Sequence, residues 1–246
     1  LENTRPAAVI HAAAVISTGT PRLELSTRIN IEGTRTLALA ALDHEVERWL
    51  QVSSMSAHPS NKSVYGATKL AADELLRDLN FPVTFFRPSL VYGSQRRGIF
   101  FKLVQLVNRL PAIPLIGQGK EPMRPVHADD LAAAFLASLD DFRTIGKTYE
   151  LGGAEDWTFR DVVRAIAAGL EKDRILLPTP LPFCRFMALV GELVSNSPPL
   201  TTDNVEGVSK AEPIDIESAC SDLSFAPRPF DEGFRQCLDE GLLKEK

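Results

Sequence analysis

The sequence predicts an α/β protein built around a parallel β-sheet. Stretches with strand character alternate with stretches of helical spacing, which is the order of elements that parallel sheets require. The expected strands are continuous apolar runs rather than alternating patterns, as in sheets covered on both faces. The chain of 246 residues is 44% hydrophobic and 24% charged, close to an average globular protein.

The first part of the chain shows this alternation in five consecutive segments. Apolar runs at residues 7–14, 49–53 and 83–87 predict three buried strands. Helical spacing of leucine and alanine predicts helices over residues 22–43 and 63–79. Strand, helix, strand, helix, strand indicates parallel neighbours joined by right-handed crossovers.

After Gly93 the elements become shorter and are separated by more proline and glycine. The expected elements here are helices over 99–110, from Asp129, from an N-cap at Thr158 to residue 170, and over 183–194, with short strands at 113–116 and 148–151. This change in element length and in proline and glycine content predicts a domain division near residue 93.

Composition excludes several classes of function. Lys plus Arg is 27 against 32 for Asp plus Glu, and a net charge of −5 disfavours nucleic-acid binding. No apolar run reaches the roughly 18 residues of a membrane span. The three cysteines, in no metal-like pairs, predict neither a disulfide framework nor a metal site. No signal-peptide pattern is present, so a cytoplasmic location is expected, with the mitochondrial matrix as the alternative because residue 1 is not Met.

One group of side chains suggests catalysis. Ser53 and Ser54 end an expected strand, and Tyr65 and Lys69 follow four residues apart on the next helix, on one face. A nearby ammonium is expected to lower the pKa of the phenol, which then exchanges a proton with a substrate oxygen held by Ser54. The alternative is an ordinary Tyr/Lys pair on a solvated helix face. The strand-end position favours a site, because open α/β sheets bind ligands there.

Six ordered segments carry a resemblance to a known family. They are residues 9–13, 30–34, 52–54, 65–69, 87–93 and 126–132. Together they resemble the extended short-chain dehydrogenases/reductases, of the NAD-dependent epimerase/dehydratase and 3β-hydroxysteroid-dehydrogenase-like kind. The resemblance implies a Rossmann-like, doubly wound parallel sheet with a smaller C-terminal α/β substrate lobe.

The resemblance also implies residue roles. The implied catalytic residues are Tyr65 as acid/base, Lys69, Ser54 and Asn30, although Asn30 is equally well explained as a helix-surface amide. The residues implied to contact NAD or NADP are Ala12, Ala13, Ala14, Ser53, Tyr65, Lys69, Pro88, Ser89 and Leu90. Those implied to contact substrate are Ser54, Met55, Tyr92 and Arg124. The sequence does not decide between NAD and NADP.

The second half of the chain carries a narrower resemblance. Residues 114–119, 148–153, 158–160 and 199–205 are similar to the 39 kDa accessory-subunit group of respiratory complex I. That group implies a scaffold that holds NADPH without turnover. A nucleotide-sugar epimerase or dehydratase is a third reading. It is weakened because Leu90 and Met123 stand where sugar-nucleotide members carry Asn and Arg.

These observations lead to one leading functional hypothesis, two alternatives and an expected domain division. The leading function is NAD(P)-dependent oxidation or reduction at a secondary alcohol or ketone of a small-molecule substrate, with the scaffold and the epimerase as alternatives. Residues 1–93 are expected to be the C-terminal part of a Rossmann-like domain. Residues 94–246 are expected to be mainly substrate lobe, with about 121–152 returning to the main sheet. Whether the protein forms a homodimer or joins a respiratory complex stays open.

Two further expectations concern the ends of this layout. No glycine-rich fingerprint is present among the 15 glycines, so we expect an N-terminal truncation of about 60 residues or more and weak dinucleotide binding by this chain. In the second half, the side chains of Phe183, Phe186, Met187 and Leu189 are expected either to pack as ordinary core or to form an apolar wall of the substrate lobe.

Overall fold

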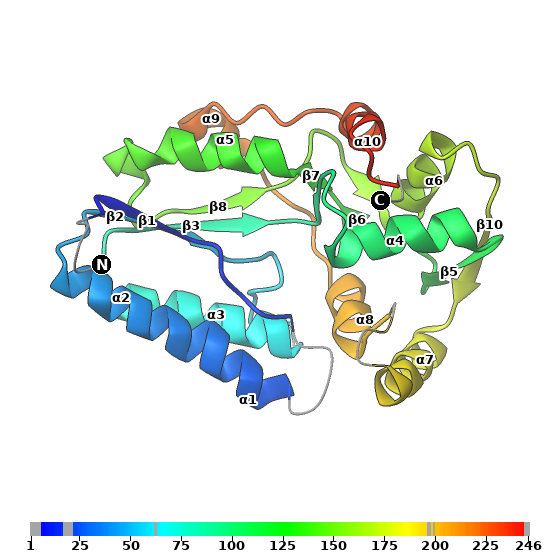
Figure 1. The fold of residues 1–246 in the computed structure, drawn as a ribbon, viewed down its shortest axis with the longest axis horizontal. Coiled ribbons are helices and arrows are strands. Elements are labelled where there is room, and N and C mark those ends of the chain that lie inside the picture. The colour runs from blue at the N-terminus through cyan, green and yellow to red at the C-terminus, as the bar shows by residue number, and fades with distance from the viewer. Residues whose placement is uncertain (1–5, 17–21, 62, 196–197, 199, 244–246) are drawn as a thin grey trace. The chain divides into compact units, whose positions relative to one another are not determined.

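The computed structural model describes residues 6–16, 22–61, 63–195, 198 and 200–243 (Figure 1). The chain forms two compact units, and each is described by itself. Unit 1 comprises Leu1–Pro88, Ala133–Leu151 and Ile216–Phe225. Unit 2 comprises Ser89–Ala132, Gly152–Asp215 and Ala226–Lys246. Each unit therefore contains segments that are far apart in sequence.

Unit 1 is built on a four-stranded sheet with the order β1-β2-β3-β8, in which all neighbours are parallel. The strands are β1 (Ala8–His11), β2 (Arg48–Val52), β3 (Val83–Pro88) and β8 (Thr148–Leu151). Most side chains of β2 and β3 are buried, including the polar Arg48, Gln51 and Thr84, so neither strand shows the alternation of a half-exposed sheet. The α/β class with a parallel sheet is thus confirmed.

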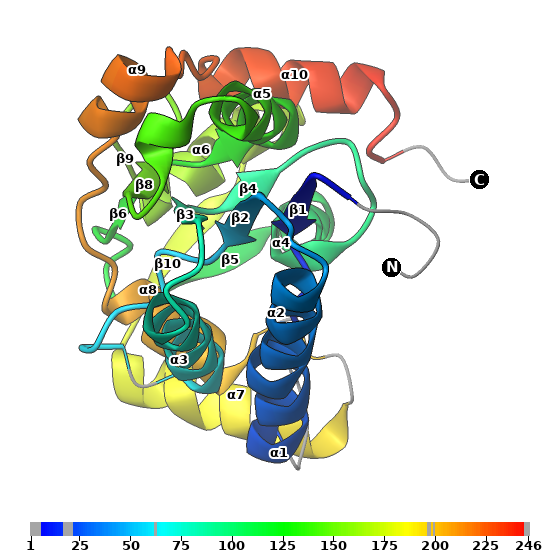
Figure 2. The ribbon, with the colours of Figure 1, turned by 90° about the vertical axis from the view of Figure 1, so that its left-hand side faces the viewer.

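Helices cover both faces of this sheet (Figures 1 and 2). On one side lie α1 (Arg22–Ser26), the π-helical turn η1 (Thr27–Glu32), α2 (Gly33–Asp43) and α3 (Val64–Asp78). On the other lie α5 (Ala128–Leu139), whose residues from Ala133 onward belong to unit 1, and α9 (Glu217–Leu223). A short 3-10 turn, η2 (Phe142–Thr144), precedes β8. Trp49, Phe81 and Phe85 are central to the core on the α2–α3 side.

Unit 2 contains three small two-stranded sheets and five helices among the residues described. The strands are β4 (Val91–Tyr92), β5 (Ala112–Ile116), β6 (Pro122–Met123), β7 (Val126–His127), β9 (Trp157–Thr158) and β10 (Ile175–Thr179). The helices are α4 (Gly98–Arg109), α6 (Phe159–Gly169), α7 (Leu181–Val194), α8 (Thr202–Ser209) and α10 (Phe230–Asp239). Its core is aromatic, with Tyr92, Phe100, Phe230 and Phe234 in contact with one another.

The local signals of the sequence match the elements well where they are strong. Thr158 caps α6 through a capping box with Asp161, as expected. Strand β10 was not predicted, and it exists because it pairs in parallel with β5 more than 60 residues away. Helices α8, α9 and α10 were also not predicted.

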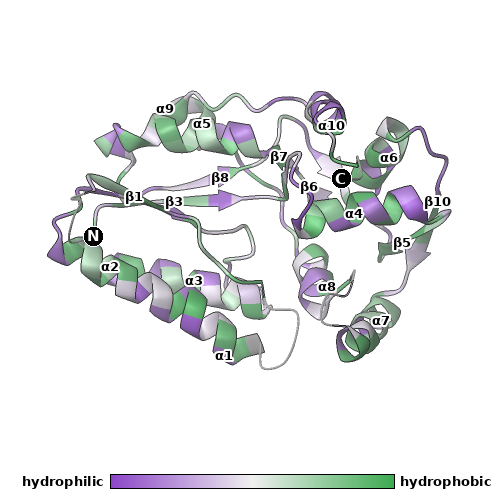
Figure 3. Cartoon of the chain, viewed as in Figure 1, coloured by the Kyte–Doolittle hydropathy of each residue, from purple (hydrophilic) through white to green (hydrophobic). Residues whose placement is uncertain are grey.

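One packing expectation is wrong. Helix α7 buries Cys184 and Ala188, while Phe183 is 54% and Phe186 58% exposed. Met187 and Leu189 are also about half exposed, so these four side chains are not ordinary core. Figure 3 shows α7 as mostly hydrophobic, and this explains the error: a helix with apolar side chains on several faces does not reveal which of them is packed.

Candidate active site

The start of α3 places the predicted acid/base residue in unit 1. Ser63 caps the helix, its hydroxyl accepting a hydrogen bond from the backbone N–H of Gly66 at 3.0 Å. A Cβ on Gly66 would lie 2.3 Å from the carbonyl oxygen of Ser56, so only glycine lets the loop after β2 approach the helix this closely. This contact fixes Tyr65 beside the carboxyl end of β2.

Ser54 is the serine that meets the phenol. Its Oγ accepts a hydrogen bond from the N–H of Ser56 at 3.1 Å, which orients the hydroxyl. Ser54 is hydrogen-bonded to Tyr65, and this bond favours the phenolate. Both side chains are only partly buried, so a substrate oxygen has access to them.

Lys69 lies one turn further along the same face of α3. Its side chain is 2% exposed, and its Nζ donates a hydrogen bond to the carbonyl oxygen of Val52 at 2.7 Å. That carbonyl is its one hydrogen-bond acceptor among the residues the structure describes. An ammonium carries three N–H donors, so two remain for a ligand.

The pKa of Tyr65 moves in the opposite direction to the one expected from the sequence. Burial raises it, the hydrogen bond from Ser54 lowers it, and the Asp73 carboxylate raises it again, with a raised pKa as the net result. The sequence argument counted the Lys69 ammonium but could not count burial. The expected lowering by Lys69 is therefore wrong for this structure.

Asn30 ties the segment after β1 to α3. Its Oδ1 accepts a hydrogen bond from the Val15 N–H at 2.8 Å, and its Nδ2 donates to the Val15 carbonyl and to Thr68 Oγ1, both at 3.1 Å. Asn30 is 1% exposed, so the alternative of a helix-surface amide is wrong. Because Thr68 is adjacent to Lys69 in α3, the hydrogen bond from Asn30 helps to fix the part of the helix that carries Lys69.

Three polar residues near this face, Asp73, Arg87 and His11, were not among the site residues predicted from the sequence. Ser53 Oγ donates to Asp73 Oδ2 at 2.6 Å, and Arg87 Nη2 lies 3.6 Å from the same oxygen. His11 Nε2 lies 2.9 Å from the hydroxyl of Thr34, which itself donates to the Asn30 carbonyl. Asp73 could have been found from the sequence, since it continues the four-residue spacing of Tyr65 and Lys69 along one helix face.

The remaining predicted residues are divided between the units. In unit 1, Ala12, Ala13 and Ala14 are exposed after β1, Met55 is partly buried, and Pro88 is buried. The N–H of Met55 donates to the Pro88 carbonyl at 3.2 Å, which joins the ends of β2 and β3.

In unit 2, Ser89 and Leu90 are partly buried and Tyr92 is 2% exposed within the aromatic core. Arg124 is occupied by the protein itself. Its guanidinium donates to the carbonyls of Gly153, Ile214 and Ala154 at 3.0–3.1 Å and lies 3.3 Å from the Asp156 carboxylate.

The residues around Lys69 fit one part of a nicotinamide dinucleotide. Two uncommitted N–H donors on a buried ammonium suit ribose hydroxyls, and small exposed alanines after β1 leave room for a flat group. No glycine-rich fingerprint occurs in the sequence to hold the pyrophosphate. The fit therefore concerns the nicotinamide end, with Lys69, Tyr65 and Ser54 as the residues that would meet it.

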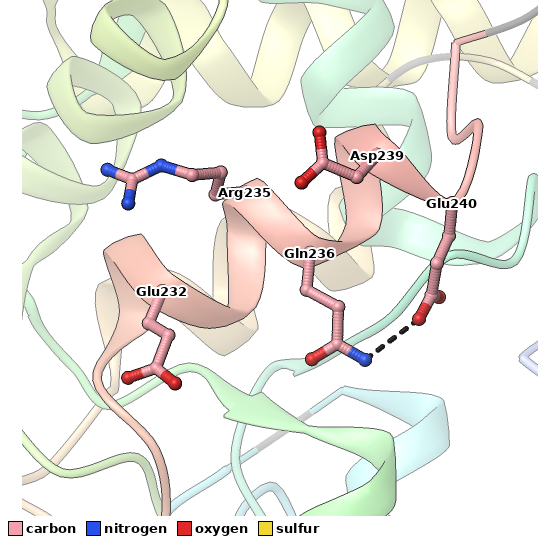
Figure 4. A pocket seen from close by; sticks show the side chains of 5 residues that line it. All are labelled: Glu232, Arg235, Gln236, Asp239 and Glu240. Atoms are coloured by element: carbon pink, nitrogen blue, oxygen red, sulfur yellow. Dashed lines mark hydrogen bonds between the residues drawn. The ribbon is translucent and has the colours of Figure 1, made fainter.

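Other surfaces of the described chain offer less chemistry. An open hollow on α10 in unit 2 is lined by Glu232, Arg235, Gln236, Asp239 and Glu240, none of which belongs to the predicted site (Figure 4). Among the residues described, no group of three or more His, Cys, Asp or Glu is arranged to hold a metal ion.

The helices of the described chain were also compared with the dimensions of a bilayer. None of them combines the length and the apolar character needed to cross a membrane.

Comparison with known proteins relates the chain to nicotinamide-dependent enzymes and to respiratory subunits. The family model "NAD dependent epimerase/dehydratase family" matches residues 1–152. NADH dehydrogenase (ubiquinone) 1 alpha subcomplex subunit 9 of Arabidopsis thaliana, a mitochondrial protein, is 32% identical over 165 residues, covering 66% of this chain and 41% of the relative. UDP-glucose 4-epimerase of Vibrio cholerae is 26% identical over 236 residues, covering 87% and 69%.

A third relative is the mitochondrial 40 kDa subunit of NADH-ubiquinone oxidoreductase from Neurospora crassa, 26% identical over 200 residues and covering 81% of this chain and 52% of the relative. The chain thus spans about half the length of the respiratory relatives it matches. Among solved structures, UDP-glucose 4-epimerase of Thermotoga maritima with UDP-glucose has a TM-score of 0.74 at 17% identity, covering 97% of this chain and 78% of that one. At this identity the likeness concerns the fold, which is Rossmann-like.

Proposed function

Because the chain belongs to the NAD dependent epimerase/dehydratase family, we propose that it provides the proton-transfer half of an NAD(P)-dependent oxidoreductase site. The reaction is hydride transfer at a secondary alcohol or ketone carbon. The observation that carries the proposal is the hydrogen bond between Ser54 and Tyr65 beside the buried Lys69, all on one side of α3. A solvated Tyr/Lys pair would not place its lysine at 2% exposure.

The residues divide the work as follows. When bound, the nicotinamide supplies or accepts the hydride. Ser54 Oγ, held by the Ser56 N–H, donates a hydrogen bond to the substrate oxygen. Tyr65 Oη gives that oxygen a proton in reduction and takes it back in oxidation. Lys69 holds the ribose with the N–H donors that Val52 leaves unused.

The raised pKa of Tyr65 has a consequence for the direction of catalysis. At neutral pH the phenol keeps its proton, so the site as described is ready to donate it to a carbonyl oxygen. Oxidation of an alcohol needs the phenolate and is therefore favoured at higher pH. Ketone reduction is thus the direction that the protonated phenol can assist near neutral pH, whereas the equilibrium between ketone and alcohol is set by the substrates and the cofactor.

A second candidate is a scaffold that holds a nicotinamide nucleotide without turnover. It is favoured by the respiratory relatives, whose names describe subunits of NADH dehydrogenase. Under this candidate the protein associates with a respiratory complex, in mitochondria if it shares the location of those relatives. The intact proton-transfer residues argue for the first candidate, because holding a nucleotide requires no phenol.

The test uses the protein with any residues that flank this segment in the natural chain. It is incubated with NADH or NADPH deuterated at C4 and a panel of ketones, and separately with NAD+ or NADP+ and a panel of UDP-sugars. We expect deuterium at the carbinol carbon of a reduced ketone, with transfer reduced about 10²–10⁴-fold in Tyr65→Phe and cofactor affinity retained. Lys69→Met, as the matched variant, should weaken cofactor binding.

Three results would contradict the proposal. Undiminished transfer by Tyr65→Phe would remove the tyrosine from the mechanism. Tight cofactor binding without transfer to any ketone would favour the scaffold. Conversion of a UDP-sugar to its epimer would favour the nucleotide-sugar reading, as in the Vibrio cholerae relative.

A further inference from the structure

Asp73 is a buried carboxylate that the proposed reaction does not use. It lies on α3 two turns after Tyr65 and one turn after Lys69 and is 1% exposed. Its Oδ2 accepts a hydrogen bond from Ser53 Oγ at 2.6 Å, whereas its Oδ1 is buried without a hydrogen-bond partner among the described residues. A buried carboxylate left partly unsatisfied is costly, so its charge needs an explanation.

The groups that face Asp73 are mostly cations. Arg87 from β3 places its Nη2 at 3.6 Å, while Arg77 and Lys69 act on the carboxylate from α3. Burial nevertheless raises the pKa of Asp73, and the hydrogen bond from Ser53 together with these cations opposes the rise. The carboxylate is thus surrounded by positive charge on two elements.

Lys69 has the complementary problem. Burial lowers the pKa of this ammonium, and the carboxylate of Asp73 is the group that opposes the loss of its proton. Burial and then the Lys69 charge lower the pKa of His11 on β1, and an imidazole, neutral or positive, provides no counter-charge to the lysine. The charge of the lysine therefore depends on a residue that touches neither substrate nor cofactor in the proposed reaction.

We propose that Asp73 is a positioning residue that keeps Lys69 in its ammonium form and, through Ser53, holds the end of β2 where Ser54 meets Tyr65. The role given to Asp73 in the site rests on the proposed function, whereas the protonation of Lys69 can be measured without any turnover. Ser53 and Ser54 are adjacent, so a bond that fixes Ser53 restricts the backbone from which Ser54 projects. The Asp73 carboxylate thus acts both on the charge of Lys69 and, through Ser53, on the position of Ser54.

The experiment follows the protonation of Lys69 directly, without substrate. Lysine side chains are labelled isotopically, and the pH titration of the Lys69 Cε resonance is followed by NMR after assignment with Lys69→Met. In Asp73→Asn, which keeps the shape of the side chain, we expect the Lys69 titration midpoint to fall by about one pH unit or more. Asp73→Glu should restore most of the shift.

Two further variants separate charge from packing. Ser53→Ala removes the hydrogen bond and leaves the carboxylate, so the Lys69 midpoint should stay near that of the unmodified protein even where stability falls. Asp73→Ser also removes the charge and should likewise lower the midpoint. This second variant keeps the proposal testable if Asp73→Asn does not fold.

An unchanged Lys69 midpoint in folded Asp73→Asn or Asp73→Ser would overturn the inference. Failure of ketone reduction alone would overturn only the proposed function, because the titration does not depend on turnover.

Discussion

Unit 1 and unit 2 each contain a tyrosine that lies beside polar side chains, and the surroundings of the two hydroxyl groups differ. Tyr65 in unit 1 is partly buried, is hydrogen-bonded to Ser54 and shares a helix face with Lys69. Tyr92 in unit 2 is 2% exposed, packs edge-on against His127 and Phe230, and its hydroxyl is without a hydrogen-bond partner among the described residues.

This difference shows that burial of a phenol does not by itself make an acid/base group. Burial raises the pKa of both tyrosines, but only Tyr65 has a hydroxyl neighbour that favours the phenolate and access for a ligand. Around Tyr65 the surrounding polar groups are hydrogen-bonded through β2, η1 and α3, whereas Tyr92 is held by ring contacts. The predictions below test this contrast.

The largest expected effect is a loss of stability on replacing the glycines packed near Tyr65 and against Tyr92. Gly66→Ala places a Cβ 2.3 Å from the Ser56 carbonyl, and we expect the free energy of unfolding to fall by about 3 kcal/mol, measured by denaturant titration. In unit 2, Gly233→Ala places a Cβ 2.2 Å from the Tyr92 hydroxyl. Tyr92→Phe should partly rescue Gly233→Ala, since it removes the clashing oxygen.

The control for both substitutions is Gly207→Ala in α8, where no atom lies within 4 Å of the added Cβ. There we expect a gain of about 1 kcal/mol from helix propensity. Equal losses at all three positions would mean that the close contacts do not distinguish the two regions.

The next effect is a pH dependence that arises from His11 in unit 1. Burial and then the Lys69 charge lower the pKa of His11 from 6.5 to about 4. The unfolded chain therefore binds a proton first as pH falls, so the contribution of neutral His11 is complete above about pH 6.5 and is lost toward pH 4.

Between pH 7.5 and pH 5 this contribution should fall by about 2 kcal/mol. We expect the difference in unfolding free energy between the unmodified protein and His11→Gln to shrink by that amount. His58→Gln, at an exposed position, is the matched control. A difference that stays constant with pH would show that His11 is not held neutral.

A smaller effect is expected at Asn30. Asn30→Asp keeps the acceptor for the Val15 N–H but removes the donors to the Val15 carbonyl and Thr68, at a cost of about 1–2 kcal/mol. The predicted signature is faster exchange of backbone amides after β1, measured by hydrogen exchange. Exchange rates like those of the unmodified protein would mean that Asn30 does not fix this segment.

The smallest effect is expected at Tyr92 itself. Tyr92→Phe removes a buried hydroxyl with no hydrogen-bond partner among the described residues and should change stability by less than about 1 kcal/mol, toward a gain. Tyr149→Phe is the contrasting variant, because the Tyr149 hydroxyl donates to Asp222 at 2.8 Å and its loss should destabilise. Thermal unfolding distinguishes the two.

Sequence reasoning succeeded where the signal is local. The spacing of Tyr65 and Lys69 placed both on one helix face, and Thr158 marked the start of α6. It failed where partners are distant in the chain. Strand β10 depends on pairing with β5, and the polarity of α7 could not show which face is packed.

The sequence by itself determined the α/β class, the parallel order of the first strands and the residues that meet on α3, because these follow from periodicity within short segments. Only the tertiary structure decided that Ser54 meets Tyr65 while Ser53 meets Asp73. It also decided that the pKa of Tyr65 is raised rather than lowered. The reason is physical: burial and hydrogen-bond partners arise from packing between segments far apart in the chain, and no local pattern specifies them.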